Sequence, residues 1–353
     1  ARDRRPSIEN RERHSLDAEE ASAFDVHPSR VRDLSFFLGA GLGHHPDVAV
    51  TRYAAFSGFN RHGNDWQDLD YYRRCEREGR DYDRHGQPHA LSQSNVYTYR
   101  TPHYMLSCAQ AYRPGRPGYQ QFIWSATLGA SLTVFTTNPA PRDIPFGRPG
   151  HWVGNGILPL AMAYRNVAIV LHRVAPYRIF DDPPWHRTDR VHAYFPRGRF
   201  DQVIDQSEWC IGQSGDAFVA LRPSQPGEWM APEPDTMPGR LNPDAQYEWM
   251  VESTDVAWIC ELGSAEEHGD FARFVDAITA SRVEGDVNSL RYDSPTRGRV
   301  DAGWDDGLRV NGQAIALTNY PRFQNPYTSV PFGESRIEIE AAGHRHVIDP
   351  AFT

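Results

Sequence analysis

Alternating apolar and polar residues dominate the chain from about residue 95 onward. The runs 97–100, 105–108, 121–125 and 132–136 change between apolar and polar character from one position to the next, and Pro and Gly lie between them. A period of two is typical of a strand with one buried face, and the Pro and Gly residues mark the turns. The pattern therefore predicts a meander of antiparallel strands.

The same period continues to the C-terminal part of the chain, with one helical interruption. Between 270 and about 281, Phe271, Phe274, Val275 and Ile278 recur on one helical face. So many short segments separated by turns predict a mainly β fold, a large antiparallel β-sandwich. The predicted strands cover residues 96–100, 104–110, 120–128, 132–137, 167–173, 191–195, 208–213, 217–222, 246–252, 257–262, 287–292, 309–310, 314–317 and 335–341.

The N-terminal part has a different pattern. Residues 1 to about 25 are charged and poor in apolar side chains, which indicates a frayed or partner-docked segment. From residue 31, apolar positions recur at helical spacing, and 48–56 is predicted as a second short helix. We therefore divide the chain into a helical segment, 1–90, and a sandwich domain, 91–353. Two helices cannot close a core, so they must pack on the sandwich or on a partner.

Composition and charge exclude several classes of function. The chain has 353 residues, 39% of them hydrophobic, which is enough for one to three folded domains. Its net charge of -9 argues against nucleic acid as a partner. It contains no lysine, so Schiff-base chemistry and a P-loop are excluded. No run approaches the roughly 20 apolar residues of a membrane helix, so no membrane partner is expected.

The cysteines point to packing rather than to metal or redox chemistry. Cys75, Cys108, Cys210 and Cys260 show no C-x-x-C spacing. The last three lie in apolar, strand-like runs, where buried free thiols are expected, with one disulfide as the alternative.

The candidates for catalysis are Arg100, His103 and Tyr104, which lie at a Pro-containing turn between two predicted strands. A Tyr or His beside an Arg can remove a proton next to a carboxylate while the Arg stabilises the enolate-like charge. Alternation places Tyr97 and Tyr99 on the face opposite Arg100. The alternative is that these aromatic residues pack a sandwich edge.

The candidates for sugar contacts are aromatic and amide side chains, which can stack on a sugar ring and hydrogen-bond its hydroxyls. The glycine-flanked turn 150–156 would carry an imidazole and an indole at the rim of a cleft; alternatively its Trp fills the core. The candidate substrate-binding residues are Tyr97, Gln120, Gln121, Trp124, His151, Trp152 and Asn155.

No cofactor is predicted, and no metal ligands are assigned. The glycines at 39–43 lack the G-x-G-x-x-G spacing of a dinucleotide site. His344 and His346 are more typical of a solvated strand edge than of a metal site. A structural calcium ion is considered only for the acidic loop 181–187.

Four motifs occur in an order that resembles a known family. They are Y-x-T-P-x-Y-M-L-S, Y-Q-Q-x-I-W-x-A-x-L-G, V-F-T-x-x-P and G-x-W-x-G-N-G. The order is similar to the sandwich of two-domain polysaccharide lyases of the hyaluronate, chondroitin AC and heparinase type, over roughly 95–330, and to related uncharacterised bacterial proteins. The resemblance implies a β-supersandwich, with 1–90 as the end of an α/α toroid and an acidic polysaccharide in the cleft between them. It also implies a secreted, periplasmic or cell-surface location in a bacterium.

The catalytic residues of such lyases come largely from the toroid, and about ninety helical residues are too few to form one. Either the chain is the C-terminal portion of a longer polypeptide, or the sandwich has been reused without a toroid. We therefore expect the sandwich portion of a lyase-like or hydrolase-like enzyme acting on a polysaccharide or oligosaccharide, with a helical partner chain or toroid completing the site. The alternatives are a non-catalytic carbohydrate-binding module and a structural module that completes a helical partner.

Overall fold

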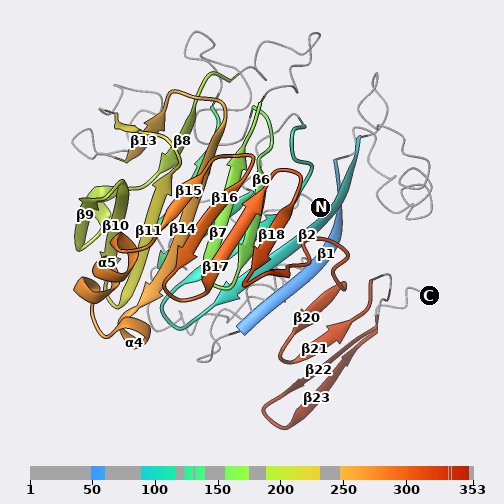
Figure 1. Ribbon diagram of the computed structural model, residues 1–353. Coiled ribbons are helices and arrows are strands. Elements are labelled where there is room, and N and C mark those ends of the chain that lie inside the picture. Colours follow the sequence, from blue (N-terminus) through green and yellow to red (C-terminus); the bar gives the residue numbers. More distant parts are fainter. Residues whose placement is uncertain are drawn as a thin grey trace, which may run out of the picture. The chain divides into compact units, whose positions relative to one another are not determined.

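The computed structural model is mainly β, as predicted, and is built from antiparallel sheets (Figure 1). It describes residues 49–59, 89–116, 123–129, 132–139, 156–174, 188–230, 247–332, 334 and 336–349, with backbone alone for 53–59 and 89–93. No helix in this described part is long and apolar enough to cross a membrane.

The largest sheet has ten strands. They are β1 (Ala49–Phe59), β2 (His89–Arg100), β3 (Met105–Gln110), β4 (Trp124–Gly129), β5 (Leu132–Thr137), β8 (Val191–Tyr194), β12 (Glu228–Trp229), β13 (Glu248–Val251), β20 (Phe323–Asn325) and β21 (Thr328–Val330). Their order across the sheet is β12-β13-β8-β5-β4-β3-β2-β1-β20-β21, so a meander from β1 to β5 is extended at both sides by strands from later in the chain.

A six-stranded sheet, which we call the middle sheet, has the order β6-β7-β14-β11-β10-β9, and a five-stranded sheet follows the order β15 to β19. Two α-helices, a 3-10 helix (Arg197–Arg199) and the hairpin β22–β23 complete the described part. The bounds are β6 (Leu160–Tyr164), β7 (Val167–His172), β9 (Gln202–Gln206), β10 (Trp209–Ser214), β11 (Ala217–Pro223), β14 (Val256–Ser264), α4 (Ala265–His268), α5 (Phe271–Thr279), β15 (Val283–Gly285), β16 (Leu290–Ser294), β17 (Gly298–Gly303), β18 (Gly307–Val310), β19 (Gln313–Ala314), β22 (Ile337–Ala341) and β23 (His344–Ile348).

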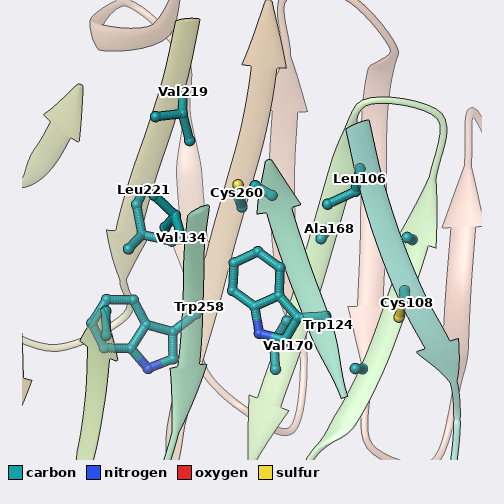
Figure 2. Close-up of a cluster of buried hydrophobic side chains, with 14 of the residues drawn as sticks. Leu106, Cys108, Trp124, Val134, Ala168, Val170, Val219, Leu221, Trp258 and Cys260 are labelled. Atoms are coloured by element: carbon teal, nitrogen blue, oxygen red, sulfur yellow. The ribbon is translucent and has the colours of Figure 1, made fainter. Parts of the chain in front are cut away.

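The middle sheet contributes to two separate cores. On β14, Trp258 and Cys260 pack into the cluster shared with the ten-stranded sheet (Figure 2). Ala257 and Ile259, which alternate with them, pack into a second cluster with the five-stranded sheet and α5. Because both faces are covered, β14 is buried along its whole length instead of alternating with polar residues. The architecture is therefore a stack of three β layers.

The predicted helix is confirmed as α5. Phe271, Phe274, Val275 and Ile278 are buried on its inner face. Its N-terminus is capped by Asp270, whose carboxylate accepts a hydrogen bond from the Arg273 backbone N–H at 2.8 Å. A cap of this kind is worth about 1 kcal/mol.

The helix predicted over 48–56 is wrong, because these residues form β1. This strand pairs with β2 from Ala49 opposite Arg100 to Phe59 opposite His89. A short apolar run does not distinguish helix from strand, and here pairing with a distant strand decides the outcome. The β structure therefore begins well before residue 91. The rest of the segment predicted as helical lies outside the described residues.

Most predicted strands are confirmed within a few residues, and β5 has the predicted bounds. Several of the missed strands are very short, lie at exposed edges, or have no polar alternation, as in β6. β17 was missed as well, although it has six residues and lies inside the five-stranded sheet. Cys108, Cys210 and Cys260 are buried free thiols, as predicted. The histidines of β23 are exposed, as expected of a solvated edge.

Candidate functional site

A pocket lies where the ten-stranded sheet extends past the edge strand of the middle sheet, β6. This edge is held by the side chain of Gln110 at the end of β3. The Gln110 amide donates to the Ala163 carbonyl at 2.7 Å and accepts from the Ala163 N–H at 2.8 Å, so it satisfies part of the free edge of β6. The two layers are therefore fixed to each other beside the pocket.

We call this cavity the edge pocket; its volume is ≈ 650 Å³. It is walled by β2, β1 and β20 of the ten-stranded sheet, by the β6–β7 turn of the middle sheet, and by β19 with the residues after it. A volume of this order is typical of small-molecule sites. Its polar and aromatic lining comes from Arg52, Tyr97, Tyr164, Arg165, Gln313, Tyr320, Gln324 and Asn325.

The charge of the edge pocket is opposite to that of the chain. The chain carries a net charge of -9. The described lining includes Arg52 and Arg165 but no Asp or Glu. Two guanidinium groups without a lining carboxylate favour an anionic ligand.

Arg165 is held in a strained backbone conformation at the rim. It lies in the turn between β6 and β7 with φ of 52°, in the left-handed region that favours glycine. Its backbone N–H donates a hydrogen bond to the Tyr97 hydroxyl at 2.8 Å. Its guanidinium lies 5.7 Å from the centre of the Tyr164 ring. A left-handed residue is common in a two-residue hairpin turn, and these contacts fix the position of Arg165 in it.

The Arg52 side chain is oriented by two contacts, with Gln324 and with Tyr320. It lies opposite Gln324 in the β1–β20 register and donates a hydrogen bond to the Gln324 side chain. Its guanidinium also lies 5.2 Å from the centre of the Tyr320 ring. Tyr320 is itself fixed, because its backbone N–H donates to the Asn95 side chain at 3.1 Å. Both arginines are thus positioned against aromatic rings.

The buried phenols of the edge pocket keep their protons at neutral pH. Burial raises the pKa of Tyr97 to about 12, and burial also raises the pKa of Tyr320 well above its usual value. These tyrosines can therefore donate and accept hydrogen bonds, but they do not supply a phenolate base.

Of the candidate residues named from the sequence, Tyr97 lines the edge pocket, whereas Arg100 does not. Tyr97 and Tyr99 are buried in the core shared by the two larger sheets, and Arg100 is half-buried on the other face of β2, as alternation predicts. Burial lowers the pKa of Arg100. Its Nε atom has no hydrogen-bond partner in the described part of the chain.

His103 and Tyr104 attach the β2–β3 turn to α4. The Tyr104 hydroxyl donates to the Glu267 carboxylate at 2.9 Å, and His103 Nε2 lies 3.4 Å from a carboxylate oxygen of Glu266. Burial and the neighbouring charge of Glu267 raise the pKa of Tyr104. Its proton is therefore held more tightly than a catalytic base allows. His103 and Tyr104 both contact α4, and no hydrogen bond joins either of them to Arg100 among the described residues, so the catalytic role expected of the three stays a prediction.

Trp124 is a core residue and not a sugar platform. Its side chain is 2% exposed and lies in the core between the ten-stranded sheet and the middle sheet (Figure 2). Its indole N–H donates to the Thr136 hydroxyl at 2.9 Å. The inward-facing positions of β4 place it there. The remaining candidates lie outside the described residues: Gln120, Gln121, His151, Trp152, Asn155, the loop 181–187 and the glycines at 39–43.

Sequence reasoning missed both arginines of the edge pocket. Arg165 stands between two apolar runs, at a place where a turn could have been read. Arg52 had no local signal, because its segment was interpreted as a helix. Within the described residues no group of three or more His, Cys, Asp or Glu side chains could hold a metal ion. In comparisons with known proteins, no family model, curated protein or solved structure matches the chain.

Proposed function

We propose that the protein binds an acidic saccharide in the edge pocket. The observation that carries this proposal is the combination of two oriented arginines, three tyrosines and three side-chain amides around a cavity of ≈ 650 Å³ with no acidic residue in its described lining. Each of these groups matches one part of a uronic acid or a similarly charged sugar.

The arginines account for the acidic part of the ligand. A guanidinium can donate two parallel hydrogen bonds to a carboxylate, a geometry that a point charge does not provide. Arg52 and Arg165 are packed against Tyr320 and Tyr164, so less side-chain entropy is lost when they bind an anion. One carboxylate held between them would fix the orientation of the sugar ring.

The rest of the lining accounts for the sugar. Tyr164 is half-buried and presents a ring at the pocket, and ring faces pack against the apolar side of a pyranose. Gln313, Gln324 and Asn325 each offer a carbonyl oxygen and an NH₂ group, which can accept from and donate to hydroxyls. Because it has an aromatic ring beside neutral amides, the edge pocket should bind a sugar acid in preference to a simple carboxylic acid.

We place this chain as the binding part of a carbohydrate-active protein. The described lining contains no His or carboxylate, and the buried tyrosines remain protonated, so it offers no base for elimination and no acid pair for hydrolysis. Cleavage would need groups from other residues, as the resemblance to toroid-containing lyases implies. A secreted, periplasmic or cell-surface location belongs to the same proposal.

Isothermal titration calorimetry with a glucuronate-containing tetrasaccharide tests this function. Its carboxyl-reduced, neutral counterpart is the matched ligand. Arg52→Gln and Arg165→Gln should each weaken binding of the acidic ligand by at least about tenfold, the equivalent of ~1.4 kcal/mol. Arg299→Gln, in an exposed ion pair with Asp301 on the five-stranded sheet, is the control and should leave affinity unchanged. Equal affinity for the acidic and neutral ligands would contradict the proposal.

The absorbance of unsaturated uronate is followed in the same mixtures, because elimination produces this group and binding alone does not. We expect no increase with this chain alone.

A further inference from the structure

The hairpin β22–β23 has a strand edge that no other strand covers in the described part of the chain. β23 pairs with β22 on one side, and no described strand pairs with its other side (Figure 1). The hairpin is attached through β22, because the Glu340 backbone N–H donates to the carbonyl of Tyr327, directly before β21, at 3.0 Å. An open edge of this kind presents backbone donors and acceptors to another chain.

The hydrogen-bond phase of the hairpin shows which backbone groups of β23 point outward. In an antiparallel pair, the residues of a strand direct their N–H and C=O alternately toward the partner strand and away from it. Because the Glu340 N–H points away from β23, its register partner Arg345 directs its own groups away from β22. The same holds for Val347 and Asp349 at the next alternate positions. We call Arg345, Val347 and Asp349 the hairpin edge.

The side chains of the hairpin edge share one exposed face of the strand. All three residues are exposed, and alternation places them on the same side. Val347, at the centre, is 47% exposed and is the one large apolar side chain that is exposed among the described residues. An apolar residue at the middle of an open edge favours contact with another strand.

Charges alternate in sign across the hairpin. Arg345 lies opposite Glu340 in the β22–β23 register and donates a hydrogen bond to Glu338. At the other end of β23, Asp349 Oδ2 lies 3.8 Å from Arg336 Nη1. The hairpin edge therefore has a positive charge at one end and a negative charge at the other. A strand with this arrangement is complementary to an antiparallel copy of itself.

A single register brings these opposite charges together. If a two-fold axis passes between the Val347 residues of two copies, Arg345 of each copy faces Asp349 of the other. Opposite charges at facing positions stabilise a strand pair, and like charges destabilise it. Moving the axis to any other residue separates Arg345 from Asp349 of the second copy, and an axis at Arg345 would place two guanidinium groups face to face. The same central register pairs the outward backbone groups of both strands.

We propose that two copies of this chain associate through the hairpin edge, as a two-fold symmetric antiparallel pair centred on Val347. The three outward positions of each strand then form about six backbone hydrogen bonds with the other copy. The same residues contribute from both sides, as in most homodimers. One strand edge buries little surface, so the dimer is reversible and not obligate. The interface is separate from the edge pocket and does not depend on saccharide binding.

Sedimentation equilibrium of the full chain tests the proposal, and we expect a monomer–dimer equilibrium at concentrations below about 1 mM. Val347→Pro is the sharpest variant, because proline removes an N–H that points away from β22 and leaves the hydrogen bonds of the hairpin intact. It should weaken dimerisation at least about tenfold. Val347→Thr, which keeps the N–H and the branched shape, is the matched control and should retain dimerisation.

Arg345→Glu and Asp349→Arg test the register. Each variant alone places like charges at both ends of the strand pair, so neither should dimerise with itself. In an equimolar mixture every facing pair again joins opposite charges, so a heterodimer should form. Fluorescence-detected sedimentation with a dye on one of the two variants measures it. Arg299→Glu, which makes the same change of charge as Arg345→Glu on the five-stranded sheet, should dimerise like the wild type.

Circular dichroism and the urea midpoint establish that each variant is folded. A wild-type chain that stays monomeric at about 1 mM would overturn the proposal and would mean that the charges protect this edge from a second copy. Dimerisation of Val347→Pro with wild-type affinity would place the contact elsewhere. Failure of the two charge variants to associate when mixed would exclude the register centred on Val347.

Discussion

The hydroxyl of Tyr97, buried in β2, accepts a hydrogen bond from the backbone N–H of Arg165 in the β6–β7 turn at 2.8 Å. The bond joins the ten-stranded sheet to the middle sheet at the rim of the edge pocket. A core residue thus fixes the backbone of an exposed arginine with a left-handed φ. Rigidity in the core is in this way transmitted to a side chain that faces solvent.

Removing this hydroxyl should weaken both the fold and the binding of acidic saccharide. Tyr97→Phe leaves the Arg165 N–H without its partner, so we expect a loss of about 1 kcal/mol in the free energy of unfolding, measured by urea denaturation. Calorimetry should show weaker saccharide binding. Tyr164→Phe is the control for stability, because the Tyr164 hydroxyl makes no hydrogen bond within the described residues, and its unfolding free energy should change by less than about 0.5 kcal/mol.

Glycine at position 165 should separate stability from binding. Arg165→Gly relieves the left-handed strain, which is roughly 1–2 kcal/mol, and loses about 0.5–1 kcal/mol through unfolded-chain entropy. We expect an unfolding free energy equal to or slightly above that of the wild type. Arg165→Ala retains the strain, so it should be less stable than the glycine variant. Both should lose affinity for the acidic saccharide; a glycine variant that binds like the wild type would contradict the role of Arg165.

Trp124 should matter for folding and not for sugar binding. Trp124→Ala opens a cavity in the core between the ten-stranded sheet and the middle sheet, and it removes the hydrogen bond to Thr136. We expect a loss of about 3–5 kcal/mol in the free energy of unfolding, measured by urea denaturation. Trp124→Phe retains most of the packing and gives enough folded protein for calorimetry. Saccharide affinity of that variant should equal that of the wild type, whereas a tenfold loss would restore Trp124 as a sugar contact.

The stability of the chain should decrease at acidic pH through His172. Burial lowers the pKa of this fully buried imidazole to about 3, and the charge of nearby His192 adds to the effect. In the unfolded chain a histidine titrates near pH 6.5, so only the unfolded state gains the proton between these values. The stabilisation is complete above about pH 6.5 and is lost as the pH falls toward 3. By pH 4 the loss should be about 3 kcal/mol.

The matched variant for this pH dependence is His172→Gln, which can still hydrogen-bond Thr136. Urea midpoints are measured for both proteins between pH 7 and pH 4. As the pH falls, the midpoint of the wild type should decrease more than that of His172→Gln. Parallel curves would show that His172 does not contribute.

The close approach of Phe200 to β10 requires glycine at position 212. A Cβ added to Gly212 would lie 2.6 Å from the Phe200 ring. Gly212→Ala should therefore cost about 1–3 kcal/mol through overpacking. Gly129→Ala, at a strand position where an added Cβ meets nothing within 4 Å, should be close to neutral. Thermal unfolding of the two variants measures the difference.

The layers were more predictable than the site. Strand β5 follows from alternation and flanking turns, and α5 follows from four apolar residues at helical spacing and an Asp cap. Strand β1 could not be predicted in this way, because its eleven residues become a strand by pairing with β2 about forty positions later. Nor could β6, because a strand covered on both faces has no polar period.

The edge pocket could hardly be predicted from the sequence, because it too depends on contacts between distant segments. Its arginines, Arg52 and Arg165, become neighbours of Tyr97 only when β1 pairs with β2 and the β6–β7 turn packs beside them. Trp124 shows the opposite error, since an aromatic residue in an alternating run faces the core as readily as a ligand. Local pattern determined which face a residue occupies, but not which faces water reaches.

Because β7 and β14 of the middle sheet are buried along their whole length, these strands depend on both neighbouring layers for their apolar contacts. A chain truncated before β15 would lack the five-stranded sheet and would expose Ile169, Ile211 and Ile259 of the middle sheet to solvent. Such a chain should aggregate. No layer can therefore be removed without exposing the apolar face of another.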